Sequence, residues 1–473
     1  MSEISKSDLP YLPHTEKDRQ EMLQAIGVSN FEELVKHIPK EIRVKDLQLA
    51  PSLSEIEVRE KISALAAKNT PASRQASFLG GGSYRRYTPA ALESIVSRSE
   101  FATAYTPYQP EVSQGTLQTI YEFQTAICLL TGMDVANASL YDGPTACAEA
   151  ALMSCRLTNR QNIYVANSLN PEYKKVTQTY AQSCGLNFKT LDTVEGFLSP
   201  KEIQIDDQAA CVIVQYSNFF GILEDLEAIG KAVKAKGAML VVLTEPISLG
   251  LLTPPGEFSA DIVIGDAQPC GNFLSFGGPS AGYLACRKDY VRQLPGRICG
   301  MTVDSEGKRA YTLTLQTREQ HIRRAKATSN ICTNQALNAL SMLVYLVLMG
   351  PIGLKQLSEI SVRRAHYLKD ELTKIPGVKL SFVRPFFNEF VIETTKPATL
   401  VLQQLQKKGV LGGIAISADY PQLEKAFLVS VTEMNSIADL QKYADALQQV
   451  MSDTQGDMLT PRSSKAATAN LAK

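Results

Sequence analysis

The sequence predicts an α/β protein, in which a large domain with a mainly parallel β-sheet is followed by a smaller C-terminal α+β domain. From about residue 113, stretches with helical periodicity alternate with short apolar runs, as strand–helix–strand units do. The apolar runs at 163–165, 211–214, 239–243 and 261–264 are almost uninterrupted, which indicates strands covered on both faces. Beyond Pro351 the pattern changes, which indicates a second structural unit.

Four segments are expected along the chain. They are an N-terminal helical arm with a glycine-aromatic segment (1–95), the large α/β domain (96–331), the small α+β domain (332–452) and a disordered tail (453–473). The tail is rich in Ser, Thr and Ala and has no apolar period, so it lacks the side chains that would hold it on a core.

In the arm, two short helical patterns are expected to end at Gly27 and Pro39, and a third helix is expected near 54–68. In the large domain, the helix expected at 115–131 has Leu117 and Ile127 on one apolar face. The next helix begins at Pro144, where a missing N–H costs nothing, and continues to Leu157.

The small domain is expected to begin with an apolar helix at 332–350 that stops at Gly350-Pro351. Its longest apolar run, 339–349, is too short to cross a bilayer, so a buried helix is expected. The remaining elements are expected as helices near 353–375, 398–408 and 436–451 and as strands near 378–382 and 389–392.

Composition excludes several classes of function. The 473 residues contain 48 basic and 48 acidic side chains, so nothing indicates a broad basic surface for nucleic acid or an anionic membrane. Nine cysteines without CxxC spacing indicate reduced thiols and a cytoplasmic protein, and the N-terminus lacks the pattern of a targeting signal. The four histidines are not at metal-ligand spacing from one another, so no metal site is expected.

Two segments are candidates for a functional surface. In the first, 78–87, Gly81 and Gly82 permit close backbone approach, Tyr84 offers an aromatic contact, and Arg85 or Arg86 could pair with a carboxylate or phosphate as easily as with a surface acid. The second, 105–114, contains two prolines that favour extended backbone, and its side chains suit a pocket at an interface. Its candidate contact residues are Tyr105, Tyr108, Gln109, Glu111, Ser113 and Gln114. Both segments are also compatible with loops packed on their own domain, with Ser113 capping the next helix.

The second segment and the glycine after it, YTPYQPEVSQG at 105–115, closely resemble the glycine decarboxylase P-protein of the glycine cleavage system. The similarity continues through TGMDVAN at 131–137, YDG at 141–143, NFFG at 218–221, LTPPGE at 252–257 and FGGP at 276–279, and covers nearly the whole chain before the tail. The resemblance implies the aminotransferase-like fold of pyridoxal phosphate enzymes, fold type I, and a part in glycine decarboxylation.

In that family some organisms use one long chain with two homologous halves, and others use two subunits. The length and motifs here resemble the first, or alpha, subunit, whereas the family's cofactor lysine belongs to the other half. Counting back from Gly277 and Gly278 places Gln268 where that lysine would stand, and an amide cannot form the covalent link to the cofactor. No covalent catalytic residue is therefore expected in this chain.

Two further positions bear on the cofactor. Asp142 and Pro144, at the start of the second helix, would repel a phosphate and remove one N–H donor, which favours a structural cap for residues 141–144. Glu245 follows the strand at 239–243, where an acid would face a pyridinium nitrogen, and an ordinary strand-end role is equally compatible.

The resemblance implies an alpha subunit that is active only with a homologous beta subunit, which carries pyridoxal phosphate. It implies glycine as substrate, the lipoylated H-protein as acceptor of the aminomethyl group, and an α2β2 heterotetramer. Two alternatives remain open at this point. One is a self-sufficient pyridoxal phosphate lyase or transferase, and the other is an inactive scaffold that stabilises a partner.

Overall fold

The computed structural model describes residues 14–44, 50–331 and 333–453. The expected disordered tail therefore lies outside the described residues, except for Asp453. The chain divides into two compact units, Met1–Thr70 and Pro71–Lys473.

The first unit contains three short α-helices, α1 (Glu16–Ile26), α2 (Phe31–Leu34) and α3 (Glu55–Ala66), and a 3-10 turn, η1 (Lys40–Ile42). Capping boxes begin α1 and α3. The hydroxyl oxygens of Thr15 and Ser54 each accept the backbone N–H of the acidic residue three positions later, and the carboxylate of that residue accepts the Thr15 or Ser54 backbone N–H. Gly27 ends α1 in the left-handed region, as expected from the sequence. None of these helices buries a side chain within the described residues.

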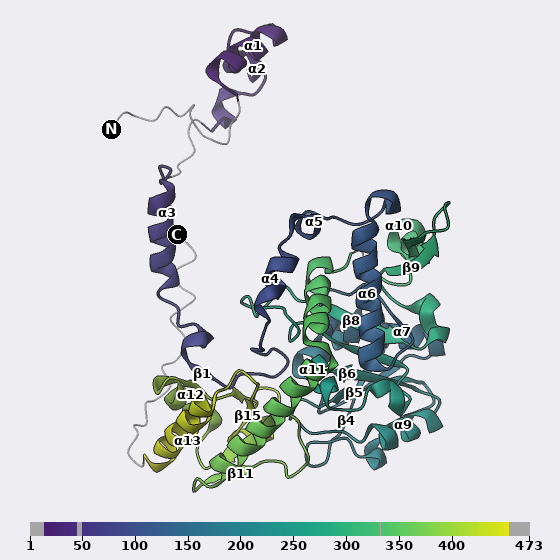
Figure 1. Ribbon diagram of the computed structural model, residues 1–473, viewed down its shortest axis with the longest axis vertical. Helices are drawn as coiled ribbons and strands as arrows, with labels where there is room; N and C mark the ends of the chain where they lie inside the picture. Colours follow the sequence, from purple (N-terminus) through teal and green to yellow (C-terminus); the bar gives the residue numbers. More distant parts are fainter. Residues whose placement is uncertain (1–13, 45–49, 332, 454–473) are drawn as a thin grey trace. The chain divides into compact units, whose positions relative to one another are not determined.

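The centre of the second unit is a seven-stranded sheet in the order β2-β8-β7-β6-β5-β3-β4 (Figure 1). The five strands from β7 to β4 run parallel, and β8 and β2 join antiparallel at one edge. The prediction of a mainly parallel sheet is confirmed. The strands are β2 (Val135–Ala136), β3 (Asn162–Ala166), β4 (Asn187–Leu191), β5 (Ala209–Tyr216), β6 (Met239–Thr244), β7 (Ile262–Asp266) and β8 (Gly282–Cys286).

Helices cover both faces of this sheet, which explains the uninterrupted apolar runs. On β5, Val212 and Val214 point into a core with α6 (Gln114–Thr131), α9 (Leu226–Ala235) and α11 (Ala336–Thr373). Cys211 and Ile213 point to the other face, into a core with α7 (Gly143–Thr158) and α8 (Pro171–Ser183). Successive strand residues alternate between the faces, so both sets must be apolar.

Helix α11 runs from the large domain into the small one and packs against α6 (Figure 1). The two helices expected on either side of Gly350-Pro351 form one kinked element, because Gly350 has the non-helical φ of 59° and Pro351 restarts the helix. By length and composition α11 could cross a membrane, but core helices meet the same test. Its Leu340, Met342 and Leu343 are buried in the core.

The small domain contains a four-stranded antiparallel sheet, β11 (Val378–Leu380), β12 (Glu389–Thr394), β15 (Ala426–Ser430) and β14 (Ile414–Ala415). Helices α12 (Ala398–Lys407) and α13 (Ile437–Ser452) pack on it. A short parallel pair joins β1 (Ala76–Ser77) to β13 (Val410–Leu411), and Phe78 is fully buried in the same core.

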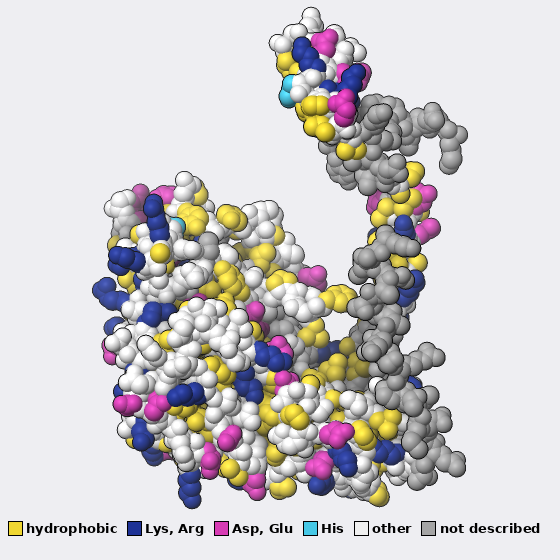
Figure 2. Space-filling view, turned by 180° about the vertical axis from the view of Figure 1, so that it is seen from behind, with side chains coloured by type: hydrophobic (Ala, Val, Ile, Leu, Met, Phe, Trp, Pro, Cys, Tyr) yellow, Lys and Arg dark blue, Asp and Glu magenta, His cyan; other side chains and the backbone are white. Residues whose placement is uncertain are grey.

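This unit contains further short elements. They are α4 (Ala90–Val96), α5 (Ser99–Ala102), α10 (Gln320–Arg323) and the hairpin of β9 (Ile298–Val303) with β10 (Arg309–Thr314). Nine 3-10 turns accompany them within the described part of this unit: η2 (Ala72–Arg74), η3 (Pro110–Val112), η4 (Pro200–Glu202), η5 (Pro246–Gly250), η6 (Pro255–Phe258), η7 (Lys288–Gln293), η8 (Gln316–Arg318), η9 (Arg324–Lys326) and η10 (Pro421–Leu423). Figure 2 shows basic and acidic side chains interspersed over one face, in keeping with the neutral charge of the chain.

Candidate functional site

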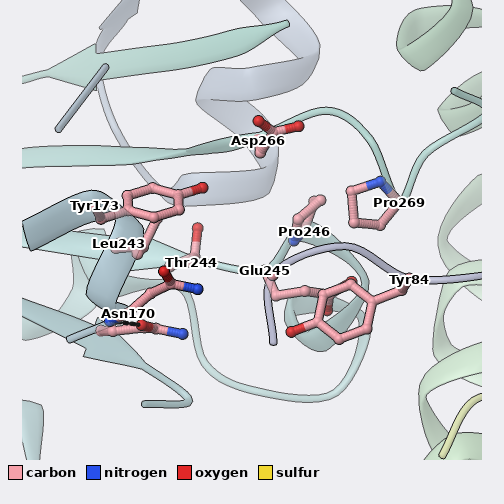
Figure 3. Close-up of a pocket in the computed structure, with 11 residues that line it drawn as sticks. Tyr84, Asn170, Tyr173, Leu243, Thr244, Glu245, Pro246, Asp266 and Pro269 are labelled. Atoms are coloured by element: carbon pink, nitrogen blue, oxygen red, sulfur yellow. Dashed lines mark hydrogen bonds between the residues drawn. The ribbon is translucent and has the colours of Figure 1, made fainter. Parts of the chain in front are cut away.

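A pocket lies at the carboxyl ends of β5, β6 and β7, the edge at which open α/β sheets bind ligands. Figure 3 shows its lining, with Tyr84 and Glu245 toward one side and Tyr173 toward the other. The pocket encloses only about 20 Å³, which is room for about one water molecule. The lining residues are Gly82, Tyr84, Asn170, Tyr173, Gln215, Leu243, Thr244, Glu245, Pro246, Asp266 and Pro269.

Gln268, two residues beyond β7, fixes the edge of this pocket. Its Oε1 accepts the backbone N–H of Tyr84 over 2.8 Å, and its Nε2 donates to the Tyr84 carbonyl over 2.9 Å and to the Asn272 carbonyl over 3.1 Å. The side chain is 9% exposed, and all of these bonds connect it to backbone. None of the 11 residues that line the pocket is a lysine.

The amino terminus of α7 lies beside the same strand ends, and carboxylates of the chain itself bind its free amides. Asp142 Oδ1 accepts the Thr145 N–H over 2.7 Å, and Asp266 Oδ2 accepts the Gly143 N–H over 2.8 Å. Pro144 has no N–H to offer. The prediction of a structural cap at 141–144 is therefore confirmed, and no donor of this helix start is left for a phosphate.

Asp266 accepts three hydrogen bonds at this half-buried position. Its Oδ1 accepts the Gln268 N–H over 2.8 Å and the hydroxyl of Ser280, in addition to the Gly143 N–H on Oδ2. Burial raises the pKa of the Asp266 carboxyl, and these hydrogen bonds act in the opposite direction. The sequence reasoning missed this residue, although an acid at the end of an apolar strand is a signal that could have found it.

Glu245, the second candidate for cofactor chemistry, is paired with a cation of the chain. Arg86 Nη2 lies 3.2 Å from Glu245 Oε1, and Arg86 Nη1 lies 2.9 Å from Glu433 Oε2. Glu245 Oε2 also accepts the Ser248 N–H over 2.7 Å and so caps η5. These partners agree with the strand-end reading of Glu245. Burial raises the pKa of its carboxyl, and Arg86 opposes that rise.

The glycine-aromatic segment packs on its own unit. The Gly81 N–H donates to Glu389 Oε1 over 2.8 Å, and the Tyr84 hydroxyl donates to Glu389 Oε2 over 2.9 Å. Gly81 and Gly82 have backbone φ angles of 69° and 113°, which residues other than glycine rarely adopt. The Arg85 carbonyl accepts from the Thr432 hydroxyl over 2.9 Å. Burial raises the pKa of Glu389 to about 7.

The segment expected to line an interface, 105–114, lies at the surface of the unit. Tyr105 is 89% exposed and Tyr108 is 54% exposed, with the Tyr108 hydroxyl accepting from Arg297 Nη2 over 3.0 Å. Gln109 and Glu111 are also exposed. A surface hollow of about 580 Å³ is lined by residues that include Tyr105, Tyr108, Gln109 and Ser113.

This segment differs from the expectation in its backbone and in its helix cap. Residues Pro110–Val112 form the turn η3 and are not extended, and Ser113 stands at the start of α6 without a capping hydrogen bond from its side chain. Instead, Gln114 joins the segment to β10, because its Nε2 donates to the Tyr311 carbonyl and its Oε1 accepts the Tyr311 N–H, each over 2.9 Å. The structure thus brings together Gly81, Gly82, Tyr84 and Gln268 at the strand ends, while 105–114 forms a separate exposed surface.

Comparison with known proteins decides the family. The family model described as glycine cleavage system P-protein matches residues 10–447 of this chain. The chain belongs to the P-protein family. A relative from Desulforamulus reducens, named "Probable glycine dehydrogenase (decarboxylating) subunit 1", is 48% identical over 93% of this chain and 99% of its own length. A crystal structure of the P-protein in inhibitor-bound form matches with a TM-score of 0.87 at 43% identity, over 93% of this chain and 100% of that chain.

The P-protein fold is that of pyridoxal phosphate enzymes of fold type I, as expected from the sequence. The glutamate decarboxylase of Lactobacillus brevis matches at only 12% identity with a TM-score of 0.64, so this likeness concerns the fold alone. The residues at the strand ends do not fit the cofactor of these enzymes. Gln268 offers no amine, carboxylates hold the α7 amides, and the pocket has about 20 Å³.

Proposed function

We propose that this chain is the alpha subunit of a two-subunit glycine dehydrogenase (aminomethyl-transferring). A homologous beta subunit carries pyridoxal phosphate on its lysine, and this chain does not hold the cofactor covalently. Together the subunits decarboxylate glycine and transfer the aminomethyl group to the lipoyl arm of the H-protein. The observation that carries the division of labour is the Gln268 side chain, whose amide is bound to backbone where the family's lysine would stand.

The contribution of this chain is a surface that completes the active site of the beta subunit. Exposed Tyr105 and Tyr108 provide rigid aromatic faces with hydroxyl groups, and exposed Gln109 and Glu111 add polar contacts. The bond between Tyr108 and Arg297 fixes one of these side chains. Ser113 and Gln114 support the segment from α6, and Gly81, Gly82, Tyr84 and Arg85 are the second segment proposed to lie near the interface.

The proposed assembly is a cytoplasmic α2β2 heterotetramer that receives the lipoylated H-protein. Support for a partner subunit comes from the names of relatives such as the Desulforamulus reducens protein, which covers almost the same length as this chain. No nucleic acid or membrane takes part in the proposed function, in keeping with the equal numbers of acidic and basic residues.

Reconstitution tests the division of labour. Exchange of labelled carbon dioxide into glycine should require both subunits together with the H-protein, and this chain alone should show none. Borohydride reduction of the assembled complex, followed by peptide mapping, should locate the pyridoxyl adduct on the beta subunit. An adduct on any lysine of this chain, or exchange by this chain without the beta subunit, would establish the self-sufficient enzyme instead.

A further inference from the structure

A second and larger cavity lies between α7, α8 and residues 325–331. Its volume is about 450 Å³, within the range of small-molecule sites, and it shares no lining residue with the pocket at the strand ends. The proposed function gives this cavity no role.

The cavity wall contains a buried carboxyl group with an unused acceptor. Glu149, in the first half of α7, is 2% exposed, and its Oε2 has no hydrogen-bond partner among the residues that the structure describes. Burial raises the pKa of this carboxyl, with Ser329 and Arg156 acting in the opposite direction. Because an unpaired buried acceptor costs stability, such a group requires an explanation, and a donor supplied by a ligand is one.

A cation stands on the same face of α7. Arg156 follows Glu149 by seven residues, or two helical turns, which separates their backbones by roughly 10 Å along the helix axis. Among the described residues the guanidinium makes one long hydrogen bond, 3.4 Å from Nη2 to the Gln293 carbonyl. Most of its N–H groups are therefore available to a carboxylate, which a guanidinium binds well.

The wall between these charges is suited to an apolar group. Leu152 lies between Glu149 and Arg156 on the lining face of α7, and Tyr141 and Tyr180 add aromatic surface from the loop before α7 and from α8. A simple cation would pair with Glu149 but be repelled by Arg156. A simple anion would pair with Arg156 but be repelled by Glu149. A ligand that carries both charges complements both side chains.

We propose that this cavity binds a zwitterionic α-amino acid with an apolar side chain. Its ammonium group donates to Glu149, its carboxylate accepts from Arg156, and its side chain contacts Leu152, Tyr141 and Tyr180. The site is distinct from the surface assigned to glycine decarboxylation, so it is tested by binding and not by turnover.

Calorimetric titration of the full chain with L-phenylalanine and two analogues tests the proposed chemistry. Phenethylamine lacks the carboxylate and 3-phenylpropionate lacks the amine. Saturable binding of L-phenylalanine is expected, with each analogue at least tenfold weaker. Absence of saturable L-phenylalanine binding would overturn the proposal, and so would an analogue that binds as tightly as the amino acid.

Three variants place the binding in the cavity. Glu149→Gln and Arg156→Gln should each weaken L-phenylalanine binding at least tenfold, whereas Glu172→Gln, an exposed carboxyl on α8 outside the cavity, should leave it unchanged. If Glu149→Gln shifts the urea midpoint of unfolding, its weaker binding could reflect a damaged fold. The exposed substitution Arg156→Gln then tests whether L-phenylalanine binds in the cavity. Wild-type affinity in Arg156→Gln would overturn the proposal.

Discussion

Gln268 and Tyr84 exchange two hydrogen bonds, 2.8 Å from the Tyr84 N–H to Gln268 Oε1 and 2.9 Å from Gln268 Nε2 to the Tyr84 carbonyl. A side-chain amide can make this pair because it carries both an acceptor and a donor. A lysine at the same position can only donate. Gln268 thus holds the glycine-aromatic segment against the strand ends.

Gln268→Lys is therefore expected to damage the fold without creating a cofactor site. It leaves the buried Tyr84 N–H without an acceptor, which should lower the free energy of unfolding by about 1–3 kcal/mol. Pyridoxal phosphate added to the variant should give no adduct at position 268 after borohydride reduction, because the pocket has about 20 Å³. The exposed change Gln441→Lys serves as the control for urea unfolding. An adduct on Lys at 268 would contradict this account of the pocket.

Glu389 should make stability depend on pH. Burial raises its pKa from the ordinary value of 4.5 to about 7, so the folded state holds the proton more strongly than the unfolded chain. Its stabilising contribution is complete below pH 4.5, is lost as the pH rises to about 7, and changes little above that. The pKa difference corresponds to about 3 kcal/mol.

Glu389→Gln should remove this part of the pH dependence. The amide oxygen can still accept the Gly81 N–H, and its nitrogen can donate to the Tyr84 hydroxyl. In urea unfolding between pH 5 and pH 8, the free energy of unfolding of the variant should rise relative to that of the wild type as the pH rises. Glu424→Gln, which replaces an exposed carboxyl, should show the same pH dependence of the free energy of unfolding as the wild type. A constant difference between Glu389→Gln and the wild type would refute the assigned titration.

Much of the fold was predictable from local pattern. Runs such as 211–214 predicted strands correctly, because Val212 and Cys211 point to cores on opposite faces of the sheet. Pro144 predicted the start of α7 within one residue, because proline fits only the first turn of a helix. The place of Gln268 just beyond β7 followed from the apolar run at 261–264, which predicted that strand.

Contacts between distant residues had no such signal. Tyr84 and Glu389 are 305 residues apart, and neither neighbourhood indicates the other. The choice of Arg86 over Arg85 as the partner of Glu245 depends on which side chain is buried, which two adjacent arginines do not reveal. The β9–β10 hairpin was missed because Gly300 and several Thr residues interrupt its apolar residues and most of its side chains are not buried, so it lacks the continuous apolar run of a core strand.

Substitutions in the exposed segment 105–114 should show whether this chain contributes to the active site or is an inactive scaffold. Tyr105 is 89% exposed, so Tyr105→Phe removes a hydroxyl without disturbing the packing of this chain. If the segment completes the beta subunit's active site, the reconstituted complex should lose at least tenfold in glycine exchange rate, about 1.4 kcal/mol in activation free energy. Glu111→Gln should act in the same direction.

Size-exclusion chromatography should show unchanged assembly for both variants, and Tyr367→Phe, on an exposed face of α11, should keep the wild-type rate. Wild-type rates for Tyr105→Phe and Glu111→Gln in the assembled complex would favour the inactive scaffold.

Asp142 should act as a helix cap and not as a group that merely excludes phosphate. Asp142→Ala removes the acceptor of the Thr145 N–H and should lower the free energy of unfolding by about 1 kcal/mol, whereas Asp142→Asn keeps an acceptor and should lose less. Neither variant should bind inorganic phosphate in a calorimetric titration, because Asp266 still holds the Gly143 N–H and Pro144 has none. Phosphate binding by Asp142→Asn would show that the charge of Asp142, and not the occupied amides, keeps this helix start free of anions.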